Sequence, residues 1–194
     1  MTKLIGFKKI NVAVFISGNG SNLKNLIISS LKKNSKFKIS LVVSNCSDAK
    51  GLAYAKKFKI KKKIINYLNI KKAEKDTLTK LKKNKIKLIC LAGFMKILSI
   101  KFIKNFNGKI INIHPSLLPK YKGLNTHQRA IDNKEKFSGC TVHYVNSKLD
   151  SGKIILQKKV KIYKSDTIKS LAKKILNQEH SLYSKAIKKI SPSL

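Results

Sequence analysis

The chain has 194 residues, of which 42% are hydrophobic and 27% charged, and its formal net charge is +36. The hydrophobic fraction excludes a disordered chain, and no apolar run reaches the roughly 20 residues that a membrane-spanning helix needs. The length fits one α/β domain better than two independent domains.

The positive charge raises a nucleic-acid-binding hypothesis, because basic side chains release counterions when they neutralise phosphates. Arg129, however, is the only arginine among the 44 basic residues, and paired hydrogen bonds to bases and phosphates favour arginine. The lysines are also spread along the chain. We therefore expect them on solvated faces, where they would still attract anionic small substrates, and we expect no specific nucleic-acid partner.

Cys46, Cys90 and Cys140 are odd in number and far apart, without a CxxC motif or mixed Cys/His spacing. This argues against a disulfide framework and predicts no metal site. The start, "MTKLIGFKKINVAVFISG", is interrupted by Lys8 and Lys9 and leads straight into a strand pattern. We expect a soluble, unprocessed, cytoplasmic protein that is not bound to membranes.

Apolar, β-branched runs alternate with helical patterns over the first 113 residues, which predicts a parallel sheet covered on both faces by helices. We expect strands at 10–16, 38–44, 62–66, 87–93 and 109–113, and helices at 23–33, 49–58, 73–84 and 100–106. After Pro115 the rhythm changes. We expect a helix at about 126–133, extended runs at 140–145 and 153–160 separated by a loop or hairpin turn, and a terminal helix at about 166–190.

The first candidate site is the loop "SGNGSN", residues 17–22, between the first strand and the first helix. Free N–H groups and the positive helix end favour a phosphate there. The dinucleotide pattern fails because Leu23 stands where a third glycine is needed, and the Walker pattern fails because no Gly-Lys-Ser/Thr follows. We predict a monophosphate or phosphoribosyl group; the alternative is a turn that needs glycine only for its backbone.

The second candidate is "INIH", where Asn112 interrupts a buried strand and His114 ends it. A buried amide without a hydrogen-bond partner costs about 1–3 kcal/mol. Ligands of open α/β sheets bind beyond the carboxyl ends of strands, and imidazole suits proton transfer near neutrality. Residues two apart on a strand share a side, so both side chains point toward one pocket. The alternative is a structural asparagine and a core histidine.

Asp150 in "KLDSG" is the third candidate, one of only eight acidic residues. A carboxylate beside His114 would orient the ring and favour its charged form, although an aspartate before Ser-Gly also suits a plain turn. Glu179, on the terminal helix, could bind a cationic or amide group. The remaining histidines form no metal-ligand spacing and are interpreted as structural or peripheral: His127, His143 and His180.

Together, "FISGNGSNL", "LAGFMKILS", "INIHPSLLPKYKGLNTHQRA", "LDSGKIILQ" and "NQEHSLY" resemble the phosphoribosylglycinamide formyltransferase family, in order and at nearly constant spacing. The match runs from about residue 11 to 187. It implies a Rossmann-like formyltransferase fold as one domain, 1–194, with a phosphate-binding half at about 10–108 and a folate-binding and catalytic half at about 109–194. It also implies formyl transfer from 10-formyltetrahydrofolate to glycinamide ribonucleotide in purine synthesis, without a metal, by a monomer or weak homodimer.

The resemblance implies roles residue by residue. The implied catalytic residues are Asn112, His114 and Asp150, and the implied phosphate-binding residues are Gly20, Ser21 and Asn22. The implied folate contacts are Met95, Lys96, Ile97, Leu98, Asn112, Asn146, Ser147, Lys148, Leu149 and Asp150, with Lys72 for the folate tail. The implied contacts to glycinamide ribonucleotide are Leu176, Asn177, Gln178 and Glu179.

Three alternatives stay open. Methionyl-tRNA formyltransferase shares the Asn/His/Asp chemistry but normally carries a second C-terminal domain. Formyltetrahydrofolate deformylase shares it too but usually has an N-terminal regulatory domain, and we expect neither addition here. A basic nucleic-acid-binding module is the alternative from a different class; it would need lysines clustered on one face and no closed pocket.

Overall fold

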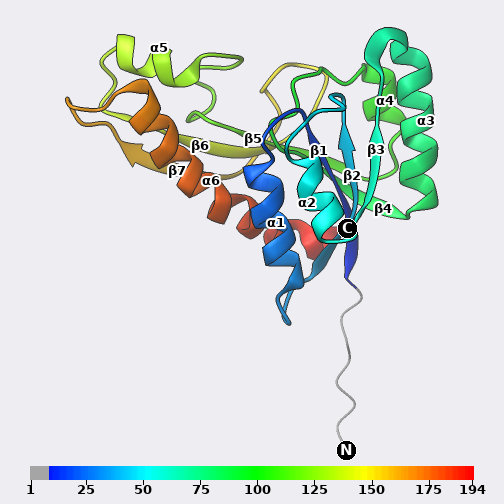
Figure 1. Cartoon of the computed structure of the whole chain (residues 1–194). Helices are drawn as coiled ribbons and strands as arrows, with labels where there is room; N and C mark the ends of the chain where they lie inside the picture. Colours follow the sequence, from blue (N-terminus) through cyan, green and yellow to red (C-terminus); the bar gives the residue numbers. More distant parts are fainter. Residues whose placement is uncertain (1–8) are drawn as a thin grey trace, which may run out of the picture.

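The computed structural model describes residues 9–194, which form one seven-stranded sheet flanked by helices (Figure 1). The strand order is β3-β2-β1-β4-β5-β6-β7. Neighbouring strands from β3 to β5 are parallel, whereas β6 is antiparallel to both β5 and β7. The predicted α/β class, a mostly parallel Rossmann-like sheet, is confirmed. Residues 1–8, part of the predicted domain and of the start that we expect to be unprocessed, lie outside the described residues.

The strands are β1 (Ile10–Ile16), β2 (Phe37–Ser44), β3 (Lys61–Ile64), β4 (Ile86–Leu91), β5 (Lys109–His114), β6 (Phe137–Tyr144) and β7 (Ile154–Lys161). The α-helices are α1 (Ser21–Leu31), α2 (Leu52–Lys57), α3 (Ile70–Lys83), α4 (Ile100–Asn105), α5 (Thr126–Asp132) and α6 (Ile168–Ile190). Two short 3₁₀ helices are η1 (Tyr67–Asn69) and η2 (Ser191–Ser193).

The central strand β1 is a continuous apolar run because both of its faces are buried. Val12 and Val14 face one core, to which α1, α2 and α6 contribute buried side chains. Ala13 and Phe15 face the opposite core, which contains residues of α3 and α4. The predicted helical cover on both faces of the sheet is therefore present.

The predicted elements are all present, and the differences lie at their ends. Helix α1 begins two residues earlier than predicted, because Gly20 takes a left-handed conformation (φ 70°) and acts as its N-cap. Helix α3 begins three residues earlier, where the Asn69 side chain accepts a hydrogen bond from the Lys72 N–H. Strand β6 also begins three residues earlier, because Phe137 pairs with Lys161 in the β6–β7 hairpin. Pairing and capping thus extend elements beyond their apolar cores.

The long helix α6 crosses the sheet beside α1 (Figure 1). Its Tyr183 is fully buried, and the hydroxyl donates hydrogen bonds to the carbonyls of Leu91 (2.8 Å) and Ile111 (3.2 Å). These carbonyls belong to the adjacent strands β4 and β5, so α6 is fixed against the strand that carries Asn112 and His114. Over residues 9–194, every helix is too short or too polar to span a membrane.

Candidate active site

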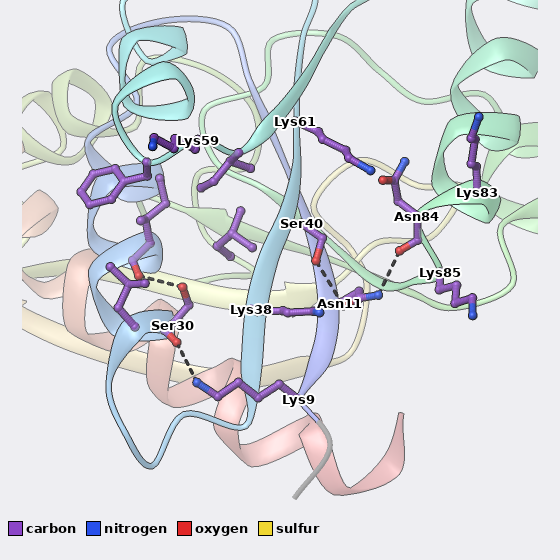
Figure 2. A pocket seen from close by; sticks show the side chains of 15 residues that line it. Lys9, Asn11, Ser30, Lys38, Ser40, Lys59, Lys61, Lys83, Asn84 and Lys85 are labelled. Atoms are coloured by element: carbon purple, nitrogen blue, oxygen red, sulfur yellow. Dashed lines mark hydrogen bonds between the residues drawn. The ribbon is translucent and has the colours of Figure 1, made fainter. Parts of the chain in front are cut away.

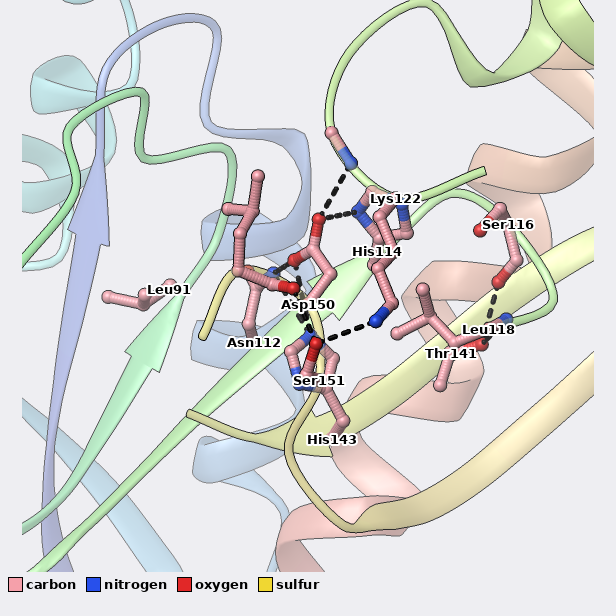
Figure 3. Close-up of polar contacts among 12 residues, drawn as sticks. Leu91, Asn112, His114, Ser116, Leu118, Lys122, Thr141, His143, Asp150 and Ser151 are labelled. Carbon is pink, nitrogen blue, oxygen red and sulfur yellow. Dashed lines mark hydrogen bonds and ion pairs between the residues drawn. The ribbon is translucent and has the colours of Figure 1, made fainter. Parts of the chain in front are cut away.

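The three side chains predicted to be catalytic lie together at the carboxyl end of β5 (Figure 3). Nδ1 of His114 is 3.4 Å from Oδ2 of Asp150, and Nδ2 of Asn112 is 3.5 Å from Oδ1 of the same carboxylate. Asn112 and His114 therefore point to the same side of their strand, as predicted. Asp150 comes from the β6–β7 connection, so the hairpin of the antiparallel strands brings the acid to the parallel part of the sheet.

The His114 ring lies between two hydrogen-bond acceptors. Its Nε2 is 2.8 Å from the carbonyl oxygen of Tyr121, and its Nδ1 faces the Asp150 carboxylate. Only a ring with protons on both nitrogens can donate to both acceptors at once. The surroundings of His114 therefore suit an imidazolium, the form that can give a proton to a departing group.

Asp150 is itself held in a left-handed backbone conformation, with φ 46°. Its Oδ2 accepts a hydrogen bond of 2.9 Å from the Gly123 N–H. Burial acts to raise the pKa of the Asp150 carboxyl, but the hydrogen bond from His143, the Gly123 N–H and the charges of His114 and His143 together outweigh burial and bring the pKa below its ordinary value. Asp150 is thus ionised and oriented at neutral pH.

His143, interpreted from sequence as structural or peripheral, lies inside this cluster instead. It pairs with Asn112 across the antiparallel β5–β6 ladder, with Nε2 3.3 Å from the Asn112 amide and 3.6 Å from the Asp150 carboxylate. Its Nδ1 lies 2.8 Å from the Tyr144 carbonyl, to which it donates. In "CTVHYV" it resembles any histidine on an apolar strand, and only the strand register brings it to Asn112.

The other two histidines do not join the cluster. Nδ1 of His127 and Nε2 of His180 are buried without a hydrogen-bond partner. Burial lowers the pKa of both rings, with a smaller effect from the charge of His114 on His127 and of Lys24 on His180. For these two histidines the interpretation as structural or peripheral stays a prediction.

The turn that follows His114 is anchored to the hairpin strands. The buried Thr141 hydroxyl donates to the Ser116 carbonyl (2.6 Å) and accepts from the Leu118 N–H (3.1 Å). Gln157 of β7 donates to the same hydroxyl (2.9 Å) and to the Leu118 carbonyl (2.8 Å). The strand exit that carries His114 is thereby fixed from β6 and β7.

The predicted phosphate loop meets α6. Gly20 precedes α1, and Asn22 donates a hydrogen bond of 2.7 Å from Nδ2 to Oε2 of Glu179. Burial raises the pKa of the Glu179 carboxyl to about 7, although the hydrogen bond from Asn22 acts to lower it. The structure thus joins a residue predicted to bind the phosphate to one predicted to bind the rest of the same substrate. The neighbouring Leu176 and Gln178 are half-buried and Asn177 is exposed.

The loop after β4 links the predicted phosphate loop to the three side chains predicted to be catalytic. Ser17, at the exit of β1, donates its N–H to the Gly93 carbonyl (3.1 Å), and its hydroxyl accepts from the Met95 N–H (2.8 Å). The last residue of β4, Leu91, pairs with Asn112 on β5. The three predicted subsites therefore follow one another along the carboxyl edge of the sheet.

Exposed apolar side chains gather in the segments predicted to bind folate. Met95 is 64% exposed, Ile97 78% and Leu149, next to Asp150, 58%. Large apolar groups exposed beside a polar cluster are typical of a binding surface for an apolar ligand. The rest of the predicted folate set differs: Leu98 is buried in the core shared with α3 and α4, and four polar residues are exposed, namely Lys96, Asn146, Ser147 and Lys148.

Lys72, the residue predicted for the folate tail, is exposed on the first turn of α3. Within the described residues, no hydrogen bond or ion pair joins its side chain to Asn112, His114 or Asp150. The short helix η1, which precedes α3, is connected to the site indirectly: its Tyr67 packs against Phe94, the residue before Met95, with 6.1 Å between ring centroids. The assignment of Lys72 to the folate tail stays a prediction.

A separate hollow of about 630 Å³ lies at the opposite edge of the sheet (Figure 2). It is formed around the first residues of β1, β2 and β3 and the end of α3, and its lining includes Lys9, Lys38, Lys59, Lys61, Lys83 and Lys85. Ligands of open parallel sheets bind at the carboxyl ends of the strands. We therefore assign the candidate active site to the Asn112 cluster rather than to this hollow.

In the part of the chain that the structure describes, no group of three or more His, Cys, Asp or Glu side chains could hold a metal ion.

Comparison with known proteins gives the family context. A family model described as formyl transferase matches residues 10–187. The phosphoribosylglycinamide formyltransferase of Haemophilus influenzae is 45% identical over 183 residues, covering 91% of this chain and 85% of that protein. The human trifunctional purine biosynthetic protein adenosine-3 is 41% identical over 187 residues, which are 95% of this chain but 18% of that protein. The crystal structure of phosphoribosylglycinamide formyltransferase from Anaplasma phagocytophilum superposes with a TM-score of 0.89 at 42% identity, covering 96% of this chain and 88% of that one.

Proposed function

This chain belongs to the formyl transferase family, and from that premise we propose that it transfers the formyl group of 10-formyltetrahydrofolate to the amino group of glycinamide ribonucleotide. The observation that carries the proposal is the cluster of Asn112, His114 and Asp150, in which His114 and Asp150 are buried and Asn112 is half-buried. This cluster lies on the same sheet edge as the loop of Gly20. The cluster supplies hydrogen-bond donors and a proton, and the loop supplies a phosphate site where helix α1 starts.

The proposed step forms one C–N bond and breaks another. The substrate amine attacks the formyl carbon, the formyl oxygen becomes an oxyanion, and the bond from carbon to the folate nitrogen then breaks. The nitrogen of the attacking amine loses a proton, and the folate nitrogen gains one. No electron carrier is required for this balance.

The side chains suit these charges. The Asn112 amide and a doubly protonated His114 can donate to the oxyanion, and His114 can then give its proton toward the departing nitrogen. Their contacts to Asp150, at 3.5 and 3.4 Å, are long. Substrate can therefore replace or shorten them at small cost. Asp150 remains a carboxylate and stabilises the imidazolium in the meantime.

The substrate contacts follow from the same geometry. We propose that the phosphate binds at Gly20, Ser21 and Asn22, where helix α1 starts, and that Glu179 receives the polar part of the nucleotide. We propose that the pterin lies against Met95, Ile97 and Leu149, whose exposed apolar surface fits a flat aromatic ring. The remaining predicted contacts, Lys72 included, keep their predicted roles as part of this proposal.

The wider predictions stay proposals of the same kind. One sheet passes through both predicted halves, because β4 and β5 pair across the boundary at about residue 108. This supports a single folding unit rather than two domains. The three cysteines are free thiols, which suits the predicted reducing cytoplasm. We propose a monomer or a weak homodimer, which a direct measurement of mass in solution checks.

The decisive experiment is a steady-state assay that offers 10-formyltetrahydrofolate with glycinamide ribonucleotide, with charged initiator tRNA, or with water alone. We expect formylated glycinamide ribonucleotide as the product. Formylation of the tRNA alone would indicate the methionyl-tRNA formyltransferase alternative, and formate release without an acceptor would indicate the deformylase.

The basic module is tested separately by a salt titration of nucleic-acid binding. Spread lysines predict weak binding that disappears steeply between about 50 and 200 mM salt and does not depend on sequence. A sequence-selective affinity that persists at 200 mM salt would support the module hypothesis against the enzyme. The hollow of Figure 2, with its six lysines, is where such binding would first be sought.

A further inference from the structure

Residues 120–125, which we call the cover loop, contact both members of the His114 and Asp150 pair. The Tyr121 carbonyl lies 2.8 Å from Nε2 of His114, and the Gly123 N–H donates to Oδ2 of Asp150 at 2.9 Å. Both contacts use the main chain of the loop. The backbone conformation of the cover loop therefore decides how the pair is oriented.

That conformation is unusual. Tyr121, Gly123 and Asn125 all have left-handed backbones, with φ of 56°, 78° and 57°. Glycine adopts this region freely, but residues with a Cβ are strained there, and asparagine tolerates it better than tyrosine. A loop with three such positions among six residues needs contacts that hold it in place.

Arg129, on the following helix α5, supplies these contacts. Its Nη1 donates to the carbonyls of Lys122 (2.7 Å) and Leu124 (3.4 Å), and its guanidinium lies 5.1 Å from the centre of the Tyr121 ring. The Tyr121 hydroxyl donates in turn to Glu135 (2.8 Å). One side chain thus binds three successive parts of the cover loop.

One of these contacts leads directly to the catalytic carboxylate. The Lys122 carbonyl and the Gly123 N–H belong to a single planar peptide group, in which the two point in opposite directions. The carbonyl accepts from Arg129 at 2.7 Å while the N–H donates to Asp150 at 2.9 Å. A cation on the carbonyl side polarises the peptide and strengthens the hydrogen bond on its N–H side.

We propose that Arg129 is a positioning residue for formyl transfer, which orients Asp150 through the Lys122–Gly123 peptide group and keeps the cover loop over His114. The inference rests on the proposed function for its effect on turnover, but the contact to Asp150 is independent of the reaction. Arg129 touches neither His114 nor Asp150 and is therefore not itself assigned as a catalytic residue.

The choice of residue type supports this role. The chain contains 43 lysines and a single arginine, and the arginine stands at this position. Lysine could supply one donor to the Lys122 carbonyl, but its ammonium cannot donate within a plane that also stacks on the Tyr121 ring. A position that only needed positive charge would be served by lysine, as at the other basic positions of this chain.

The test compares R129A, R129K and R129Q with wild type and with Q128A. Gln128 is the adjacent residue of α5, and its side chain bonds to Asp132 (2.6 Å) rather than to the cover loop. Each protein is titrated by ¹³C NMR of its aspartate carboxyls, of which the chain has five, and is then assayed for kcat and KM. The charged and polar groups that face Asp150 are His114, His143, Asn112 and the Gly123 N–H, and all stay unchanged.

In R129A we expect the Asp150 carboxyl to titrate at higher pH than in wild type, and kcat to fall about tenfold to a hundredfold with little change in KM for the ribonucleotide. R129K should recover only a small part of the lost kcat and of the change in the Asp150 titration. Q128A should match wild type in both measurements. If R129A does not fold, R129Q replaces it in the same comparison, because glutamine keeps a polar side chain but lacks the charge and the full reach of arginine. An Asp150 titration and a kcat that are unchanged in a folded variant would overturn the inference.

The two proposals fail differently. If wild type does not formylate glycinamide ribonucleotide but the Asp150 titration moves in R129A, the proposed function is wrong and the contact through the peptide stands. If wild type is active and the titration and kcat of R129A match it, the role of Arg129 is wrong and the proposed function stands.

Discussion

Asn22, at the start of α1, donates a hydrogen bond of 2.7 Å to Glu179 of α6, although 157 positions separate them in the sequence. Both side chains are buried, and Oδ1 of Asn22 has no hydrogen-bond partner. A buried carboxylate with one neutral partner and an unsatisfied amide oxygen weaken the fold. Such an arrangement is expected where a ligand completes the missing contacts, at the expense of stability in the free protein.

The first prediction is that Glu179→Gln stabilises the free protein at alkaline pH. The pKa of this carboxyl is about 7 in the folded state, against 4.5 ordinarily. Between these two values the unfolded chain is ionised while the folded protein resists ionisation, so the folded state loses stability as pH rises. Glutamine does not titrate and can still accept from Asn22. In urea unfolding at pH 8, we expect the free energy of unfolding of the variant to exceed that of wild type by about 1–3 kcal/mol. At pH 4.5 the two free energies should differ little.

The matched control for this prediction is Glu135→Gln. Hydrogen bonds from Lys120 and Tyr121 lower the pKa of the Glu135 carboxyl, so its ionised form is favoured in the folded protein. Glu135→Gln should therefore not raise the free energy of unfolding at pH 8. Equal stability of Glu179→Gln and wild type at pH 8 would contradict the cost assigned to burial of Glu179. In the formylation assay, the same variant should raise KM for the ribonucleotide, because a proposed contact is weakened.

The second prediction concerns the His114 and Asp150 pair. His114→Ala removes the proposed proton donor, and Asp150→Asn keeps the size of the side chain but removes the charge that stabilises the imidazolium. We expect each to lower kcat by about 10²–10⁴-fold, with folded proteins by circular dichroism and urea unfolding. A fall in kcat of less than tenfold in both variants, measured at saturating substrates, would contradict the roles proposed for the pair.

The third prediction is that His143→Ala has a smaller effect with its own signature. His143 supports Asn112 and Asp150 at 3.3 and 3.6 Å. Its hydrogen bond lowers the pKa of the Asp150 carboxyl, so its removal should raise that pKa and move the acidic limb of the kcat/KM profile to higher pH. We expect kcat to fall about tenfold. The control is Ser138→Ala, on the same strand, because the Ser138 hydroxyl has no hydrogen-bond partner. This variant should leave the pH dependence of kcat/KM unchanged.

How much of this site could be predicted from the sequence depends on how each contact is encoded. Asn112 and His114 are two residues apart on one strand, so the alternation of side chains predicts their shared direction without any tertiary information. The contact of His143 with Asn112 depends on the register between β5 and β6, and an apolar strand pattern does not specify register across a long connection.

The same reasoning separates the other features. The glycine loop before α1 and the carboxylate in "LDSG" follow from local turn chemistry, which is why they could be found in the sequence. The contact of Asn22 with Glu179 needs two helices to pack side by side, and the contact of Arg129 with the cover loop needs three left-handed residues. Neither arrangement has a periodic signal, because each is decided by packing and hydrogen bonding between segments.

The last prediction concerns Gly152, which lies in the β6–β7 connection two residues after Asp150. A Cβ at this position would overlap the carbonyl oxygen of Tyr144. The same carbonyl accepts the hydrogen bond from Nδ1 of His143, and the Tyr144 N–H donates to the Lys153 carbonyl (2.9 Å). Gly152→Ala must therefore push the two strands of the hairpin apart beside Asp150. We expect a loss of about 1–3 kcal/mol in unfolding free energy and a fall in kcat larger than the loss of folded protein explains.

Gly18→Ala provides the control for the stability measurement, since a Cβ there would meet no atom within 4 Å. It should unfold at nearly the same urea concentration as wild type. The position of Asp150 can be followed through its ¹³C carboxyl titration, which should move in Gly152→Ala because the distance to the Gly123 N–H changes. If Gly152→Ala matched wild type in stability, titration and kcat, the hairpin would be able to accommodate the side chain. Close packing at Gly152 would then not be what places Asp150 against His114.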